Sequence, residues 1–136
     1  MYTVFQQAYS FLVAAERCME ERKHPNGQIQ MPIIPSVVNA TFACELYLKG
    51  MLDKNNIDFP YKHDLKILFN LLPCDIRNKI ECVFQDENID FEKELDKAKD
   101  LFIDWRYLHQ KIATVGTIHA NLEFLRLFMN TLSDCH

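Results

Sequence analysis

Glycine is scarce, with three residues in a chain of 136. Loops that cradle phosphate need several glycines at fixed spacing, and neither GxxxxGK nor GxGxxG occurs. The GxSxG nucleophile turn and the HExxH zinc motif are also absent. Any catalysis would therefore depend on side chains brought together from different helices.

Cysteine is present in an odd number, five, and no CxxC or CxxH pair occurs. This pattern predicts neither a disulfide framework nor a zinc site. We expect free thiols in a reduced, cytoplasmic protein that needs no metal or cofactor. Cys44 lies in an apolar run and is expected in the core.

Basic residues do not dominate, since 15 Lys and Arg face 19 Asp and Glu and the net charge is −4. This balance argues against coating nucleic acid by bulk electrostatics, although it permits a local basic patch. No apolar run approaches the roughly 20 residues of a membrane span. The start of the chain lacks the basic segment of a secretory signal, so no membrane association is expected.

Apolar residues are plentiful at 49%, which is typical of one globular domain spanning residues 1–136. Their 3.6-residue periodicity predicts an all-α, up-and-down bundle of five to six helices. The predicted helices are Tyr2–Lys23, Val37–Asp53 after an N-cap at Ser36, a short helix after an N-cap at Asp64, Cys74–Phe84 after Pro73, Phe91–Ile112, and a last helix after an N-cap at Thr117.

The stretch Gly27–Pro35 is apolar but carries Pro32 and Pro35, which exclude a regular helix. We expect an extended connection, with a weak strand pattern, that packs against the bundle. A lid over a site is the less favoured reading.

Glu45 lies among apolar neighbours on the second helix, which is predicted to be central. A buried carboxylate needs a partner, and Arg106 on the long helix is the candidate. A structural ion pair is favoured over a functional one, because internal pairs perturb ionisation without serving chemistry.

A second group of candidates follows on the long helix: Trp105, Arg106, Tyr107 and His109. Arg106 and His109 are three residues apart and share a helix face. An arginine can hold a phosphate and a histidine can move a proton, which together suit RNA cleavage. A half-exposed structural histidine is the favoured alternative.

His63 precedes Asp64, the predicted N-cap. His63 is expected to help close the start of that helix. A His–Asp catalytic pair is not favoured, because adjacent side chains rarely face each other.

Three segments in order resemble the HEPN superfamily: NATFACELYLKGML (Asn39–Leu52), KHDLKILFNLLP (Lys62–Pro73) and LFIDWRYLHQK (Leu101–Lys111). The resemblance implies an up-and-down helical bundle, often a homodimer, of the kind found in toxin–antitoxin, phage-defence and RNA-processing systems. Active members of this family are metal-independent ribonucleases. They carry an arginine followed after four to six residues by a histidine, on a late helix, and the site is completed across a dimer.

The chain departs from that catalytic motif. Two residues separate Arg106 from His109, and Arg126 is followed by no histidine before His136. We therefore expect a non-catalytic HEPN-like module that dimerises or senses RNA in a microbial defence or stress system, with Glu45, Asp64 and the Trp105–Tyr107 segment organising its core or a groove. A cognate nucleotidyltransferase and RNA are its candidate partners. The alternative is a divergent metal-independent endoribonuclease in which Arg106 holds the phosphate and His109 or His63 moves protons.

Overall fold

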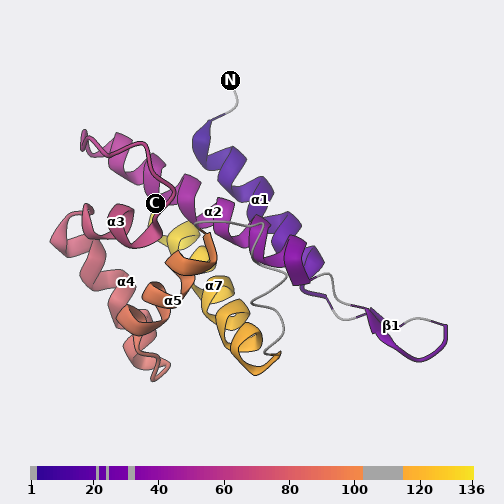
Figure 1. Ribbon diagram of the computed structural model, residues 1–136. Coiled ribbons are helices and arrows are strands. Elements are labelled where there is room, and N and C mark those ends of the chain that lie inside the picture. Colours follow the sequence, from indigo (N-terminus) through magenta and orange to yellow (C-terminus); the bar gives the residue numbers. More distant parts are fainter. Residues whose placement is uncertain (1–2, 21, 24, 31–32, 103–114) are drawn as a thin grey trace.

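The computed structural model describes residues 3–20, 22–23, 25–30, 33–102 and 115–136, and most of them are helical (Figure 1). The elements in chain order are α1 (Val4–Cys18), β1 (Arg22–Lys23), β2 (Ile29–Gln30), α2 (Ile33–Lys54), α3 (Leu65–Asn70), α4 (Cys74–Asp86), α5 (Phe91–Phe102) and α7 (Val115–Cys135). The six helices of this described part confirm the predicted all-α bundle.

Helix α1 begins at a capping box: the Thr3 hydroxyl accepts from the Gln6 amide, and the Gln6 side chain accepts from the Thr3 amide. One side of the helix is buried, at Ala8, Leu12 and Ala15. The helix ends at Cys18, earlier than the predicted Lys23. After Met19 the sequence offers no apolar residue to bury, so continuing the helix would gain little from packing.

A small hairpin follows α1, in which β1 pairs antiparallel with β2 and Arg22 lies opposite Gln30. Its turn places Gly27 at φ +85°, a conformation that suits glycine, and the Asn26 side chain accepts from the Gln28 amide. Figure 1 shows this hairpin projecting away from the helices. The expectation that this stretch packs against the bundle is therefore wrong for the hairpin.

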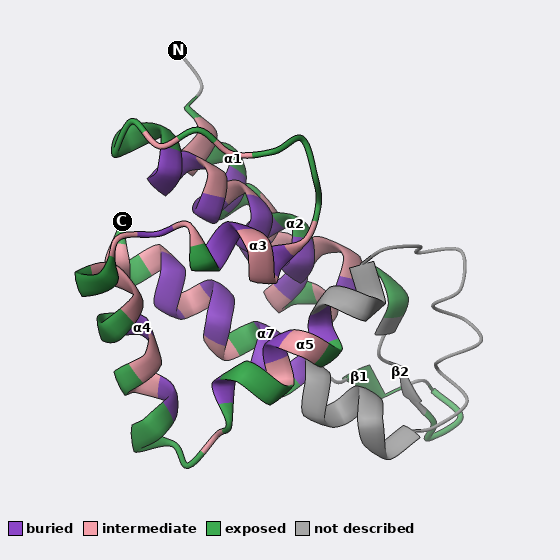
Figure 2. Cartoon of the chain, turned by 60° about the vertical axis from the view of Figure 1, so that its left-hand side comes forward, coloured by how far each residue is buried: buried purple, intermediate pink, exposed green. Residues whose placement is uncertain are grey.

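Helix α2 starts at Ile33, before the predicted N-cap at Ser36. Pro35 lies in the first turn, where amide groups have no partner within the helix, so a proline is tolerated there. The helix contacts α1, α3 and α7, which makes it the central element that the sequence predicts. Figure 2 shows the buried sides of α1, α2 and α7 turned toward one another.

Helices α3, α4 and α5 form the other side of the bundle. Asp64 caps α3 by accepting from the amides of Lys66 and Ile67, and Pro73 precedes α4, both as predicted. Five phenylalanine rings pack between α3, α4, α5 and α7, with centroid distances from 4.7 to 6.2 Å: Phe69, Phe84, Phe91, Phe124 and Phe128. Edge-to-face and tilted packing of this kind stabilises a core beyond area burial alone.

The last helix begins at Val115, not after an N-cap at Thr117. Gly116 lies inside this helix, where a glycine costs only about 1 kcal/mol of helix stability. The burial of the apolar stripe from Leu122 to Leu132 outweighs that cost. The predicted helix Phe91–Ile112 is described as far as Phe102, and its remainder lies outside the described residues.

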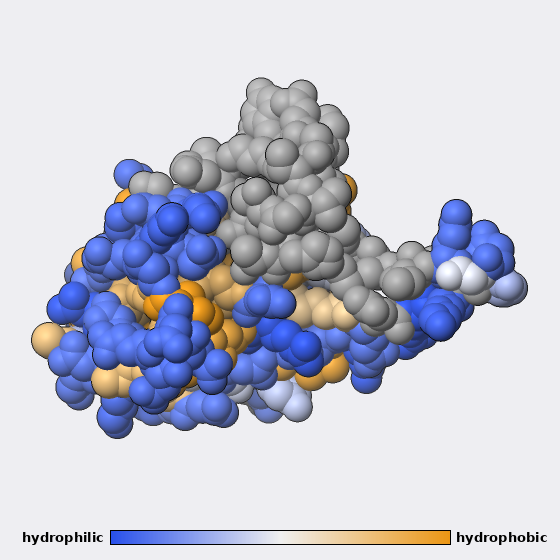
Figure 3. Space-filling model, turned by 90° about the horizontal axis from the view of Figure 1, so that it is seen from below, coloured by the Kyte–Doolittle hydropathy of each residue, from blue (hydrophilic) through white to orange (hydrophobic). Residues whose placement is uncertain are grey.

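Among the described residues seen from below in Figure 3, most of the surface is hydrophilic, an apolar band lies between the hydrophilic regions, and the hairpin at the edge is polar. Within the described part of the chain, no helix has the length and apolar character needed to cross a membrane.

Candidate functional site

Three of the predicted site residues, Glu45, His63 and Asp64, fall within the described part of the chain. Trp105, Arg106, Tyr107 and His109 lie outside it, and so does the expected pair between Glu45 and Arg106. The candidate site within the described residues is therefore the group of side chains around Glu45.

Glu45 lies on α2 with its side chain 5% exposed. Its Oε1 atom is 2.7 Å from Lys49 Nζ and 2.6 Å from His63 Nδ1. We call Glu45, Lys49 and His63 the Glu45 cluster. Two cationic or donor groups thus satisfy a carboxylate that would be costly to bury alone.

The backbone explains why these three residues meet. Lys49 follows Glu45 by four residues and so lies one turn further along the same helix face. The chain then turns back, as the Ile57 amide donates to the Leu52 carbonyl at the end of α2. Asp64 fixes the start of α3, and this places the preceding His63 against α2. The partner of His63 is therefore Glu45, and its role is to connect the loop after α2 to that helix.

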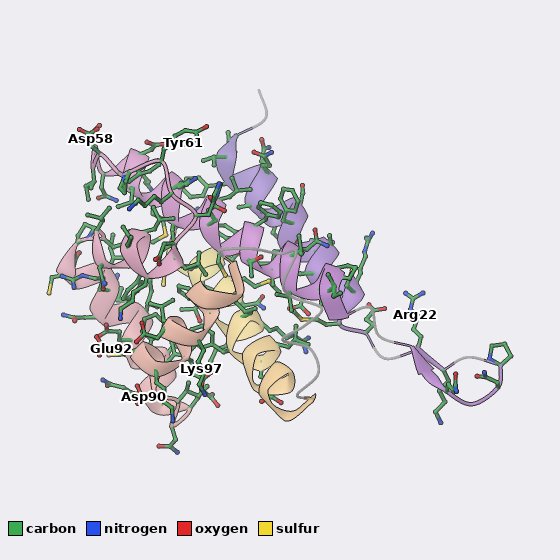
Figure 4. The ribbon with its side chains drawn as sticks, in the orientation of Figure 1. Arg22, Asp58, Tyr61, Asp90, Glu92 and Lys97 are labelled. Atoms are coloured by element: carbon green, nitrogen blue, oxygen red, sulfur yellow. The ribbon has the colours of Figure 1, made fainter. Side chains whose placement is uncertain are left out.

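Two aromatic rings lie beside the ammonium group of Lys49. The Nζ atom is 5.8 Å from the centroid of the Tyr61 ring and 6.0 Å from that of Phe59. Phe59 is half-buried against the core, whereas Tyr61 is 98% exposed. Figure 4 shows Tyr61 at one extremity of the molecule, on the loop that follows α2.

The Glu45 cluster leaves two kinds of hydrogen-bonding capacity. The carboxylate binds Nδ1 of His63, so this contact does not use the other ring nitrogen, Nε2. The side chain of His63 is 65% exposed. The ammonium of Lys49 carries three donors, of which the carboxylate takes one.

Arg126 of α7 and His136, which follows that helix, both contact α1. Arg126 binds Glu16 of α1 through two contacts, Nε to Oε1 at 3.1 Å and Nη2 to Oε2 at 2.8 Å. Asn130 adds a hydrogen bond to the same carboxylate at 2.9 Å. His136 stacks on Phe5 with centroids 4.2 Å apart and planes 9° apart. These residues join the ends of the bundle.

Among the residues that the structure describes, no three His, Cys, Asp or Glu side chains are grouped as metal ligands would be. Cys44 is fully buried, and burial raises the pKa of its thiol, which keeps it protonated and unreactive.

Lys49 and Tyr61 were not among the residues singled out from the sequence. The spacing of Glu45 and Lys49 was a readable signal, because oppositely charged residues four apart on a helix pair with each other. Nothing in the sequence indicated that Tyr61 would be exposed next to that lysine, since the loop geometry decides it.

The family model of the HEPN domain matches residues 1–135, nearly the whole chain. The chain therefore belongs to the HEPN domain family. None of the curated proteins or solved structures compared with it matches.

Proposed function

We propose that this HEPN domain is a non-catalytic interaction module that acts as a homodimer in a microbial defence, toxin–antitoxin or stress system in the cytoplasm. The observation that carries the proposal is an apolar stripe on the outer face of α2. We define the α2 stripe as Ile34, Val38, Phe42 and Leu46.

The members of the α2 stripe follow one another at intervals of four residues, so they run as a band along one side of the helix. Phe42 is 43% exposed and Ile34 is 37% exposed, while Val38 and Leu46 are half-buried. Phe11 of α1 borders the band, its ring centroid 5.5 Å from that of Phe42. Exposed aromatic residues within an apolar band are typical of interface centres.

A second copy of this chain is the occupant that we propose for the α2 stripe. No acidic or basic residue occurs from Gln30 to Cys44, so two copies can bring these segments together without opposing like charges. An antiparallel pair of α2 helices around a two-fold axis would set the stripe against itself, as an isologous interface requires. Dimers are also frequent in the family to which the chain belongs.

The test is the mass in solution of the wild type and of Phe42→Ser, measured by light scattering at micromolar concentration. The wild type is expected at twice the 16.0 kDa of one chain, and Phe42→Ser at the mass of one chain. Tyr9→Ser is the matched control, because Tyr9 is also an exposed aromatic residue but lies on α1. A monomeric wild type, or a Phe42→Ser variant that remains dimeric, would rule out this interface.

The absence of catalysis is supported by the roles of the described residues. Arg126 is held by Glu16, and His136 is stacked on Phe5, so both already serve packing. A non-catalytic module in such a system would act through a cognate protein, for which a nucleotidyltransferase is the candidate.

The alternative function, a metal-independent endoribonuclease, gains support from one observation, the bond between Glu45 and His63. A carboxylate that fixes an imidazole prepares its other nitrogen for proton transfer. Incubation of structured and single-stranded RNA with the protein in EDTA decides between the two functions. Our proposal expects no cleavage. Cleavage that is lost in His63→Ala, or in Arg106→Ala and His109→Ala, with the fold retained, would establish the alternative.

A further inference from the structure

The hairpin formed by β1 and β2 projects from the bundle and gains little support from it (Figure 1). Its strands have two residues each, and the main contacts of β1 are with β2. A two-stranded hairpin of this size is at best marginally stable in water unless a further surface packs against it. Arg22, Lys23 and residues 25–28 are exposed, so the described part of this chain covers none of them.

A second exposed feature lies in the loop after α2, residues 55–64, which we call the α2–α3 loop. Tyr61 is 98% exposed, although an aromatic ring left in water gains no hydrophobic stabilisation. Asp58 and Lys62, in the same loop, are exposed too. Figure 4 shows Arg22 at one extremity of the molecule and Asp58 and Tyr61 at another, with α2 between them. The hairpin and the α2–α3 loop therefore lie beyond opposite ends of α2.

The α2–α3 loop borders the side of α2 that carries the α2 stripe. Lys49 follows Phe42 by seven residues, about two turns, so the two side chains leave the helix on the same side. The Nζ atom of Lys49 is 5.8 Å from the ring centroid of Tyr61. This contact places the ring just beyond Leu46, the last residue of the stripe.

A two-fold axis through the middle of the α2 stripe determines what each end of the helix meets. The stripe is centred near Ala40, so Ile33, the first residue of α2, lies about 10 Å from the two-fold axis along the helix. Lys49, and with it the ring of Tyr61, lies about 13 Å from the axis in the other direction. In an antiparallel pair, the hairpin that precedes α2 in one copy therefore comes to the α2–α3 loop of the other copy.

The charges of the hairpin and of the loop suit this contact. Successive residues of a strand point to opposite faces, so Arg22 and Lys23 cannot both face one surface. Arg22 Nη2 binds Glu20 Oε2 at 3.0 Å, whereas no described acidic residue pairs with Lys23 and no described basic residue pairs with Asp58. A lysine suits both groups of the loop, because it can pair with the carboxylate of Asp58 and lie over the ring of Tyr61.

We infer that the hairpin of one copy binds the α2–α3 loop of a second copy, with Lys23 paired to Asp58 and the ring of Tyr61 covered by β1. This inference rests on the proposed dimer and adds two identical contacts to it, one at each end of the α2 stripe. Each contact covers a ring and a hairpin that a single chain leaves in water. Because an isologous dimer makes every such contact twice, one substitution acts at both ends of the interface.

The experiment is a dilution series of the full chain followed by light scattering, which gives the dissociation constant of the dimer. Tyr61→Ala is expected to raise that constant about tenfold. Lys23→Glu and Asp58→Lys each bring like charges together at both ends, and each is expected to raise it about tenfold at low salt and by less at high salt. Lys93→Glu is the matched control, because Lys93 is an exposed lysine on α5, and it is expected to dimerise as the wild type does.

A mixture of the two charge variants gives the decisive measurement. In a dimer of one Lys23→Glu chain and one Asp58→Lys chain, opposite charges meet again at both ends. The mixture is therefore expected to recover the dissociation constant of the wild type, which neither variant has alone. A folding defect in either variant would not be repaired by mixing, so recovery identifies a contact between two copies.

The outcomes separate this inference from the proposed function. Wild-type dissociation constants in Lys23→Glu, Asp58→Lys and Tyr61→Ala overturn the inference and leave the dimer through the α2 stripe standing. A mixture that stays as weak as the separate variants also overturns the inference. A Phe42→Ser variant that stays dimeric, while the mixture recovers, overturns the stripe as the interface and leaves the hairpin contact standing. A monomeric wild type overturns both proposals.

Discussion

Two neighbouring residues of α2 show how local surroundings decide the state of an ionisable side chain. Cys44 faces the core, is fully buried, and stays neutral because burial raises the pKa of its thiol. Glu45 is nearly as buried but has Lys49 and His63 within hydrogen-bonding distance. One helix therefore carries a neutral group and a paired group side by side, and each avoids an isolated buried charge in its own way.

The buried thiol of Cys44 predicts a loss of stability in alkali. In the unfolded chain the thiol has a pKa of about 8.5, so it releases its proton above that pH, while the folded protein keeps the proton. The unfolded state then binds fewer protons than the folded state, and the free energy of unfolding falls as pH rises. From about pH 8.5 to pH 10 the loss from this one group is about 2 kcal/mol. Denaturant unfolding at both pH values measures it.

Cys44→Ala is the control for this prediction, because it removes the titrating group. Its free energy of unfolding should fall by less over the same pH interval, although the variant starts lower because it leaves a small cavity. Tyr47, whose pKa is also raised by burial, adds a further decline above about pH 10 in both proteins. If the free energy of unfolding falls equally with pH in Cys44→Ala and in the wild type below pH 10, Cys44 does not cause the loss.

At the scale of elements, α3 depends on its cap. The helix has six residues, which is too short to be stable on its own propensity. Asp64 accepts from the amides of Lys66 and Ile67, with its Oδ1 atom at 2.9 and 3.3 Å. We predict that Asp64→Ala lowers the free energy of unfolding by about 1 kcal/mol, measured by denaturant titration.

Asp64→Asn is the matched variant, because its amide oxygen can accept the same bonds. It should retain most of the stability that Asp64→Ala loses. If both variants lose equal stability, the charge of Asp64 and not its capping bond is what α3 needs.

The sequence predicts elements well where one local interaction decides them. Asp64 and Pro73 mark the starts of α3 and α4 because capping and proline geometry act over a few residues. The start of α2 was misplaced because Pro35 was read as a helix breaker, whereas the first turn accepts it. The sequence did not predict that the hairpin projects from the bundle. Its polar turn is clear in the sequence, but its strands have only two residues each, which is too short for a strand pattern to show.

The candidate site was predictable only in part. That Glu45 would need a partner follows from its apolar neighbours, and Lys49 could have been found from helical spacing. The contact with His63 depends on how the loop after α2 turns back, which no periodicity reports. The same loop fixes the exposure of Tyr61, so the ring and the cluster become neighbours only in three dimensions.

At the scale of the whole molecule, the bundle is joined by contacts between its first and last helices. Glu16 of α1 binds Arg126 and Asn130 of α7, residues 110 and 114 positions further along the chain. Helix α7 also packs against α2 and contributes Phe124 and Phe128 to the ring cluster. The α1–α2 pair needs only nearby sequence, whereas the core is complete only with α7.

This arrangement has a consequence for the chain during its synthesis. Helices α1 and α2 leave the ribosome before α7 and can pair at once, because their contacts are local. The faces of α2 and α4 that α7 covers stay exposed until α7 has emerged. Exposed apolar surface on an unfinished chain promotes aggregation. A chain that stops before Val115 is therefore expected to engage chaperones or to precipitate, because the core of the domain closes only when α7 docks.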